Sequence, residues 1–484
     1  MSFTKLNLRS KLINAIRYIL IITLSFLTFM YKYEYPQWLF WDENYHISAA
    51  EKYIRHIAFV EPHPPLGKLF IALWEKIINP NKNIDKAYFV NTDYIREVPS
   101  QYSFKGVRFF PALFGALWGI LFFLILITLT KNYFLSFVFS LAYIFDNALI
   151  VHFRWAMLDS ILIFWILFTL YFFFKAIYAH QNLERKKYYI LTGVWIALTT
   201  ATKLNWLFLI LLFLPLMKKS IQNALISILI SILTFLSIFY IHFFLSDNIN
   251  PNLKPTLPSY YKQIVEQHKN KNPLYTPFLT YIYIKAGINY HEGVPKFQGY
   301  LSEWENGSLP MDWPLGIKSI NYRWEKTADG KVKYLYLQAN PVVRLIWLVG
   351  VILWLSLTIT SFIFSPLLKP NQLTKSYIYN ISILTLLYTA YMGGMILIPR
   401  VMYLYHYFPA LIISVLISGT VASLLVKIYK ISHNIQKLIL VTLWFLIIAW
   451  WYIYSPLTYF KPISEKYFNK INIFKLWYLK PIKN

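Results

Sequence analysis

Residues 107–129 read VRFFPALFGALWGILFFLILITL, an apolar run with one charged residue near its start. A helix of about 20 such residues crosses the roughly 30 Å hydrocarbon core of a bilayer. Ten further segments predict spans of this kind: 13–30, 132–151, 158–178, 188–201, 204–217, 221–245, 342–365, 376–397, 403–426 and 436–455. The two short ones, 188–201 and 204–217, could form one bent segment. The sequence therefore predicts an all-α integral membrane protein with about eleven transmembrane helices.

The composition supports a membrane protein and argues against several other classes. The 484 residues are 57% hydrophobic, and the formal charge of +26 comes from 47 Lys+Arg against 21 Asp+Glu. These basic residues are spread through the loops without a stripe or a nucleic-acid motif, so attraction to anionic lipid head groups explains them better than nucleic-acid binding. Cysteine is absent, which excludes a disulfide framework, a thiolate metal site and a cysteine nucleophile.

Basic residues at the start of the chain predict a cytoplasmic N-terminus. Four of them precede or open the first apolar run: Lys5, Arg9, Lys11 and Arg17. A cleaved signal peptide is the alternative, but the bulky residues 31–36 offer no small-residue cleavage site. We therefore expect a multi-pass protein of the cell (plasma) membrane. The expected segments are an N-terminal transmembrane catalytic module (1–245) with a first external loop (31–106), an external loop region (246–341), a C-terminal four-helix transmembrane module (342–455) and an external tail (456–484).

Two adjacent acids, Asp42 and Glu43, follow the first span. They open segment 43–59, whose apolar residues recur at helical spacing, so this segment predicts an amphipathic helix at the membrane surface. In one interpretation Asp42 caps that helix and Glu43 stabilises its first turn. In the other, the acids supply a general base. The two interpretations are compatible, because a cap position also favours the ionised carboxylate.

A proline-rich motif, Glu61-Pro62-His63-Pro64-Pro65-Leu66-Gly67-Lys68, lies further along the same loop. Its prolines forbid a helix until after Pro65. A helix that begins there would point unpaired N–H groups outward, where they could hold a phosphate. The alternative is a rigid turn between two surface helices.

Six charged residues at the ends of spans share the outer leaflet with Asp42 in the expected topology: Arg108, His152, Arg154, Asp159, Lys203 and Arg400. Each cation could extend to the lipid head groups on its own. Together they could instead bind the phosphate of a lipid, for which arginine offers bidentate contacts. The aromatic residues outside the spans are equally open to two interpretations, as interface anchors or as a surface on which a sugar stacks. They are Trp304, Trp313, Tyr322, Trp324 and the run Tyr405-His406-Tyr407.

These motifs together resemble the protein O-mannosyltransferases (glycosyltransferase family 39, fold type GT-C). The resemblance is most specific in Phe40-Trp41-Asp42-Glu43 and in His63-Pro64-Pro65-Leu66. Weaker matches follow in order: Gly106-Val107-Arg108-Phe109, Arg154 to Asp159, Thr200 to Lys203, Trp313-Pro314-Leu315, Ala339-Asn340-Pro341 and Tyr405-His406-Tyr407. The external loop 246–341 has no room for the MIR repeats of the eukaryotic enzymes, so the chain looks like the shorter prokaryotic type.

The resemblance implies a reaction. A mannosyl group would move from polyprenyl-phosphate mannose to a Ser or Thr hydroxyl of an exported protein, with inversion, on the non-cytoplasmic face. A phosphate leaves readily, so one carboxylate base and several cations suffice. We therefore expect Asp42 as the base and Glu43 as the neighbour that orders the site or binds acceptor. The expected phosphate ligands are Arg154, Lys203, Arg400 and Arg108, and the expected site-shaping residues are His63, Pro64, Asp159 (by orienting Arg154), His406 and Trp313.

No cofactor or metal site is predicted, although Asp42, Glu43 and His63 could ligate a divalent cation. Three other functions stay open. The first is a related GT-C transferase that glycosylates a lipid or glycan, such as an aminoarabinose transferase. The second is a multi-span transporter or flippase, and the third is a non-catalytic subunit. Members of the family can associate, so a homo- or heterodimer is a further expectation.

Overall fold

The structure is a computed structural model that describes residues 3–253, 257–300, 305–363, 372–473 and 475–480. Its backbone contacts divide the chain into two compact units. One unit comprises residues 29–115 and 152–295, and the other comprises 1–28, 116–151 and 296–484. Both units are discontinuous in sequence, and the four consecutive segments expected from the hydropathy pattern stay a prediction.

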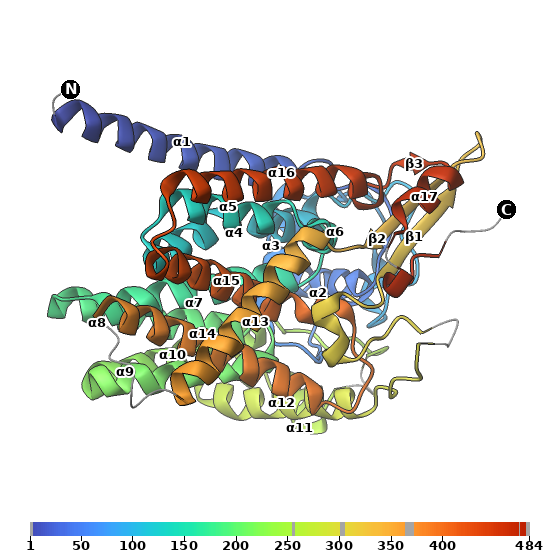
Figure 1. Ribbon diagram of the computed structural model, residues 1–484. Helices are drawn as coiled ribbons and strands as arrows, with labels where there is room; N and C mark the ends of the chain where they lie inside the picture. The colour runs from blue at the N-terminus through green and yellow to red at the C-terminus, as the bar shows by residue number, and fades with distance from the viewer. Residues whose placement is uncertain (1–2, 254–256, 301–304, 364–371, 474, 481–484) are drawn as a thin grey trace. The chain divides into compact units, whose positions relative to one another are not determined.

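The unit of residues 29–115 and 152–295, called here the N-terminal unit, is helical. Its elements are α2 (Glu43–Ile54), α3 (Leu66–Ile78), η1 (Ala87–Val90), the start of α4 (Lys105–Thr130), α7 (Asp159–Tyr178), α8 (Asn182–Thr200), η2 (Leu204–Leu212), α9 (Phe213–Lys219), α10 (Ile221–Phe244), α11 (Ser259–Glu266), η4 (Lys269–Lys271), η5 (Pro273–Tyr275) and α12 (Thr276–Glu292). Helix α8 packs between α7 and α10 (Figure 1).

The other unit, called here the C-terminal unit, combines helices with a small sheet. It contains most of α1 (Phe3–Phe29), the rest of α4, α5 (Tyr133–Ile144), α6 (Asn147–Phe153), η6 (Pro310–Leu315), β1 (Ile320–Lys326), β2 (Val332–Leu337), α13 (Pro341–Ile363), α14 (Gln372–Ile396), η7 (Leu404–Tyr407), α15 (Phe408–Ile428), α16 (His433–Thr458), β3 (Pro462–Ile463), α17 (Glu465–Ile471) and η8 (Lys475–Trp477). Helix α15 packs against both α13 and α14.

Where the structure describes them, the eleven segments expected to span the membrane are mostly helical, but they differ in length and polarity. Within the described residues, seven helices are long and apolar enough to cross a bilayer: α1, α4, α7, α10, α13, α15 and α16. The pair α5 and α6, bent by 58°, supplies an eighth if it counts as one broken span. The expected segments 188–201 and 204–217 become α8 and then η2 with α9, separated by residues 201–203, of which Thr202 and Lys203 are polar.

The antiparallel sheet is the exception to the all-α expectation. Its strand order is β1-β2-β3, and β1 and β2 form a hairpin within the expected external loop 246–341. Tyr334 and Tyr336 of β2 pack with Phe468 of α17 and Trp477 of η8 in one apolar cluster. Figure 1 shows the hairpin, β3 and α17 together at the end of α16. Alternating aromatic residues can bury one face of such a sheet, and this pattern is too short to stand out in a hydropathy profile.

Helix α2 differs from the amphipathic surface helix expected over 43–59. It ends at Ile54, and ten of its twelve residues are buried. Its polar face is covered by the segment that follows α3, because Lys52 forms an ion pair with Asp93 and Glu51 forms one with Lys86 at 2.9 Å. A charged helix face can be buried only where such partners meet it.

A close approach between α3 and α4 depends on Gly106. A Cβ atom added at this glycine would lie 2.0 Å from a carboxylate oxygen of Glu75 and 2.9 Å from the Glu75 Cα. Glu75 is itself held by Asn81, whose amide donates to it at 2.8 Å. The contact with the Glu75 backbone is too tight for any larger residue at position 106, so this glycine allows the start of α4 to pack directly against α3.

Candidate active site

Asp42 lies at the N-terminus of α2, as expected, but its side chain makes no capping hydrogen bond. Its backbone carbonyl accepts from the N–H groups of Tyr45 and His46 at 3.0 and 3.1 Å, which starts the helix without the carboxylate. The Asp42 side chain is partly exposed, whereas Glu43 beside it is fully buried. The two adjacent acids therefore occupy different environments and can have different roles.

Glu43 is held by a complete set of donors. The Arg108 guanidinium donates to both of its oxygens, from Nε at 2.7 Å and from Nη2 at 2.8 Å. The backbone N–H groups of Phe40 and Ala156 donate to the same carboxylate at 3.1 and 2.7 Å. Four donors leave Glu43 little capacity to bind an acceptor or a metal. Its position fits the expected role of ordering the site and does not fit that of binding acceptor.

The expected role of Arg108 as a phosphate ligand disagrees with the structure. Besides its bonds to Glu43, Arg108 donates to the backbone carbonyls of Glu34, Pro36 and Trp38 at 2.5–2.9 Å. These contacts engage all five donors that a guanidinium possesses. The side chain is also fully buried. Arg108 therefore acts here as a structural cation that ties the loop after α1 to the start of α2.

Lys203, Asp159 and His152 form a second buried polar cluster. The Lys203 ammonium lies 2.7 Å from one Asp159 oxygen, and His152 Nε2 lies 3.1 Å from the other. Lys203 directly precedes η2, and the backbone N–H of Leu66 at the start of α3 donates to Ala201 nearby at 3.0 Å. Within the described residues, Lys203 donates one hydrogen bond, so two of its three N–H groups can serve a ligand.

Asp159 does not orient Arg154, which corrects the expectation from sequence. Both Asp159 oxygens are engaged by Lys203 and His152. Arg154 instead donates through Nη2 to the backbone carbonyls of Tyr31 and Lys32, at 2.8 and 2.6 Å. Its guanidinium carbon also lies 5.5 Å from the centre of the Trp155 ring. Arg154 thus anchors the first residues of the external loop.

The proline-rich motif forms a rigid turn that leads into α3, as the sequence predicts. Lys68 returns from α3 to this turn and donates to Glu61 at 2.8 Å, to the backbone carbonyl of His63 at 2.7 Å and to the Tyr283 hydroxyl at 3.2 Å. Pro64 is buried, and the His63 ring lies 5.5 Å from that of His291 at the end of α12. The buried ammonium of Lys68 therefore fixes the shape of the turn that presents His63.

His46 lies one turn after Asp42 on α2 and is almost fully buried. Burial, together with the positive charges of Lys68 and Lys203, holds the pKa of this imidazole well below its usual range. The same causes lower the pKa of His63, on which the charge of Lys203 acts more strongly than that of Lys68. Both rings are therefore neutral at pH 7, and they place two neutral imidazoles beside two lysines.

These lowered pKa values predict that the protein loses stability in mild acid. The unfolded chain binds protons on histidine below about pH 6.5, while the folded chain resists protonation, so the free energy of unfolding falls as the pH falls below that value. Thermal unfolding of the detergent-solubilised protein between pH 7.5 and 5.5 would measure the slope of stability against pH. We expect His46→Gln to reduce the slope and His180→Gln, at an exposed position, to leave it unchanged. Equal slopes for His46→Gln and the parent would contradict the assignment.

Three expected site residues belong to the C-terminal unit. Trp313 is fully buried, where its indole donates to Ser308 at 2.9 Å and stacks on His406 with ring centres 6.1 Å apart. It is therefore neither an interface anchor nor an exposed stacking surface. His406 Nδ1 contacts the backbone of Tyr403 at 3.0 Å. Arg400 is half-exposed, and its role as a phosphate ligand stays a prediction. Trp304 lies outside the described residues.

No group of three His, Cys, Asp or Glu side chains within the described ranges is arranged to hold a metal ion. The possible cation site at Asp42, Glu43 and His63 has a specific obstacle, because the donors around Glu43 already use its oxygens. Beside the buried Glu43, the start of α2 instead supplies a partly exposed carboxylate at Asp42, and the same unit supplies cationic groups with hydrogen-bond donors.

Comparison with known proteins gives a consistent assignment for both parts of the chain. The family model described as dolichyl-phosphate-mannose-protein mannosyltransferase matches residues 19–247. The model described as the C-terminal four TMM region of protein-O-mannosyltransferase matches residues 291–477. The chain belongs to the protein O-mannosyltransferase family. The residues that carried the resemblance in the first loop lie within the first of these matches.

Individual relatives of the family are distant. Dolichyl-phosphate-mannose–protein mannosyltransferase 6 of Saccharomyces cerevisiae is 29% identical over 194 residues, which cover 40% of this chain and 25% of that protein. The protein of the same name from Candida albicans is 26% identical over 212 residues, or 42% and 25% of the two chains. The chain thus matches about a quarter of the length of these curated relatives.

A solved structure shows that the family fold extends over nearly the whole chain. It is described as the S. cerevisiae protein O-mannosyltransferase Pmt1-Pmt2 complex bound to the sugar donor. The match covers 96% of this chain and 92% of that chain, with a TM-score of 0.79 and 14% sequence identity. The protein is therefore a multi-span membrane protein with the GT-C fold, as the sequence motifs suggested.

Two features of this family member escaped the interpretation of its sequence. His46 follows Asp42 by four residues, so helical periodicity alone places both on one face of α2. Tyr290 and His291 at the end of α12 approach the same region, since the Tyr290 hydroxyl lies 3.4 Å from that of Tyr45. No sequence signal connects α12 to the first loop, because 245 residues separate Tyr45 from Tyr290.

Proposed function

We propose that this protein transfers a mannosyl group from polyprenyl-phosphate mannose to Ser or Thr hydroxyls of exported proteins, on the non-cytoplasmic face and with inversion. The observation that carries the proposal is the contrast between the two acids at the start of α2. Glu43 is locked in a buried ion pair, while Asp42 beside it keeps a partly exposed carboxylate that does not cap the helix. A fixed neighbour and an accessible carboxylate suit a general base.

In this mechanism the acceptor hydroxyl attacks the anomeric carbon while its proton passes to Asp42. The bond from that carbon to the phosphate oxygen breaks, and polyprenyl phosphate leaves with the electron pair. A general base of this kind contributes about 10²–10⁴-fold to the rate. The phosphate needs no protonation to leave, so cations that hold its charge complete the machinery. Attack from the face opposite the phosphate inverts the anomeric configuration.

Lys203 is the cation that the geometry favours for the phosphate. Its ammonium is held by Asp159 and retains two N–H groups, whereas Arg108 has used all of its donors. The neutral His46 and His63 add polarity nearby without a competing charge. The second and third phosphate ligands, for which Arg154 and Arg400 remain candidates, are part of the proposal.

We expect Lys203→Gln to weaken use of the lipid donor. Glutamine can still bond to Asp159 but loses the charge, and a hydrogen bond to a charged group is worth roughly 1.5–3 kcal/mol. The value of kcat/KM for the donor should therefore fall about 10- to 100-fold, with the KM for the acceptor unchanged. The matched control is Lys262→Gln, which removes a partly exposed lysine on α11. Equal donor kinetics for both variants would exclude Lys203 as a phosphate ligand.

A transfer assay tests the function itself. Membranes that contain the protein would receive radiolabelled polyprenyl-phosphate mannose and a Ser/Thr-rich peptide. Label in the peptide supports the proposal. Label in lipid or glycan would assign the chain to a different transfer reaction, and no transfer from several lipid-linked sugars would overturn the proposed activity.

A further inference from the structure

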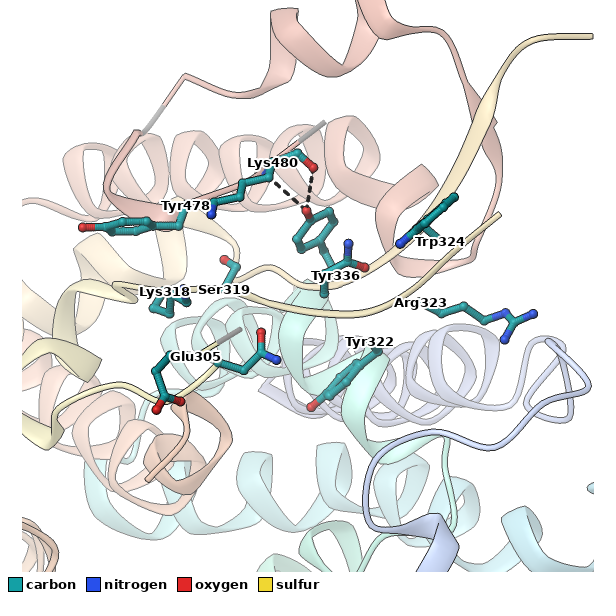
Figure 2. Close-up of a pocket in the computed structure, with 11 residues that line it drawn as sticks. Glu305, Lys318, Ser319, Tyr322, Arg323, Trp324, Tyr336, Tyr478 and Lys480 are labelled. Carbon is teal, nitrogen blue, oxygen red and sulfur yellow. Dashed lines mark hydrogen bonds between the residues drawn. The ribbon is translucent and has the colours of Figure 1, made fainter. Parts of the chain in front are cut away.

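A hollow in the C-terminal unit lies between the β-hairpin and the segments before and after it. Its volume is about 480 Å³, within the range of roughly 300–1,000 Å³ common for ligand pockets. In Figure 2, Tyr478 and Lys480 lie on one side of the segment that carries Lys318 and Ser319, and Glu305 lies on the other. We call this hollow the hairpin groove; it is lined by residues 305–306, 318–319, 321–324, 336, 478 and 480.

The walls of the hairpin groove are fixed by contacts that link segments far apart in sequence. The Tyr336 hydroxyl donates to the backbone carbonyl of Lys480 at 2.9 Å and accepts from the Lys480 N–H at 3.1 Å (Figure 2). The Ser319 N–H donates to the carbonyl of Trp477 at 2.9 Å. The groove is therefore a built feature of the fold and does not depend on side chains that happen to lie near one another.

The groove carries positive charge that Glu305 compensates only in part. Lys318 is only 5% exposed, and its ammonium lies 5.4 Å from the centre of the Tyr478 ring. Across the described part of the chain, neither Lys318 nor Lys480 has a carboxylate at ion-pair distance; the pairs near them belong to Arg323, Lys331 and Lys333. The oxygens of Glu305 accept from backbone N–H groups of Gly307 and Gln298. Burial, and then the charge of Lys480, lowers the pKa of Lys318. An anionic group in the groove would relieve this repulsion.

The remaining walls favour an extended polypeptide. β1 pairs only with β2 among the strands of the sheet, so its other edge can accept main-chain hydrogen bonds from an added strand. Tyr322 and Trp324 of β1 line the groove and offer aromatic faces, with Trp324 46% exposed. A flat membrane surface could not reach Lys318, whereas a carboxylate on a flexible side chain can enter the hollow.

We propose that the hairpin groove binds acidic segments of the acceptor polypeptide, with Lys318 and Lys480 contacting Asp or Glu side chains of those segments. The groove is then a specificity subsite, separate from the residues that carry out transfer. This inference rests on the proposed function for its biological role, although binding of an acidic peptide can be measured without any transfer.

Steady-state kinetics test the subsite. The substrates would be two Ser/Thr peptides that differ only in flanking Asp and Glu against Asn and Gln. For the double variant Lys318→Gln/Lys480→Gln, we expect KM for the acidic peptide to rise about 5- to 10-fold, because two ion pairs of modest strength are lost. The kcat value and the KM for the neutral peptide should not change. The Lys318→Arg/Lys480→Arg variant should restore the parent value, and Lys331→Gln on the hairpin turn is the matched control. Equal KM shifts for both peptides, or none, would overturn the subsite.

A binding measurement separates this inference from the proposed function. A fluorescent acidic peptide without Ser or Thr would be titrated into the full chain in neutral detergent. We expect binding to the parent, weaker binding to the double variant, and loss of binding at high salt. Equal binding by both proteins would overturn the groove even if transfer is observed. Displacement of the peptide by phosphatidylglycerol but not by a second acidic peptide would overturn it in favour of a lipid site. Peptide binding without transfer would retain the groove and reject the activity.

Discussion

Replacing Asp42 by asparagine is expected to reduce sugar transfer by about 10²–10⁴-fold, the usual contribution of a general base. The change removes the negative charge and keeps the size of the side chain. Because the Asp42 carboxylate makes no capping hydrogen bond, α2 should form as in the parent. Transfer of radiolabelled mannose to a Ser/Thr peptide, at equal protein in the membrane, measures the effect.

Two controls sharpen this result. Thermal unfolding of Asp42→Asn should match that of the parent, which separates lost chemistry from lost structure. Glu97→Gln, at an exposed carboxylate of the same loop, tests whether any acid in the first loop has the same effect. Undiminished transfer by Asp42→Asn would remove this residue as the base, and the mechanism would then need a different proton acceptor.

Arg108→Met is expected to destabilise the protein by about 3–5 kcal/mol, because removing one partner of a buried ion pair leaves the other charge buried without a counter-ion. Glu43, which has no solvent exposure, would keep a negative charge without its cation. The three backbone carbonyls that Arg108 holds would lose their donor as well. The unfolding midpoint and the yield of folded protein in detergent report this loss.

The double variant Arg108→Met/Glu43→Gln distinguishes a structural cation from a phosphate ligand. Removing both charges should recover part of the lost stability, because the uncompensated carboxylate is gone. Arg96→Gln, at an exposed arginine of the same loop, should have the stability of the parent. If Arg108→Met instead kept its unfolding midpoint and showed only a raised KM for the lipid donor, the structural role would be wrong.

The sequence was most informative where one physical property repeats along the chain. Runs of apolar residues predicted a helical membrane protein with many spans. Among the described residues, seven helices, or eight with the bent pair α5 and α6, are long and apolar enough to cross a bilayer. Proline geometry predicted that α3 begins after Pro65, which it does. The motifs around Asp42 and His63 predicted the family, which both family models confirm. These are local properties, so neighbouring residues suffice to determine them.

Only the tertiary structure determined which charged side chains keep hydrogen-bond donors or acceptors that could bind a ligand. Arg108 and Lys203 look alike in sequence, since both are single cations at the end of an apolar run. Glu43 reaches Arg108 across 65 positions and Asp159 reaches Lys203 across 44, and these contacts leave the lysine, unlike the arginine, with donors for a ligand. In the same way, the burial of the polar face of α2 and the groove beside the hairpin arise from distant segments. The sequence alone thus determined where helices form and to which family the chain belongs. The hydrogen-bond partners that decide whether a charged side chain has a structural role or can bind a ligand are brought together only when the chain folds.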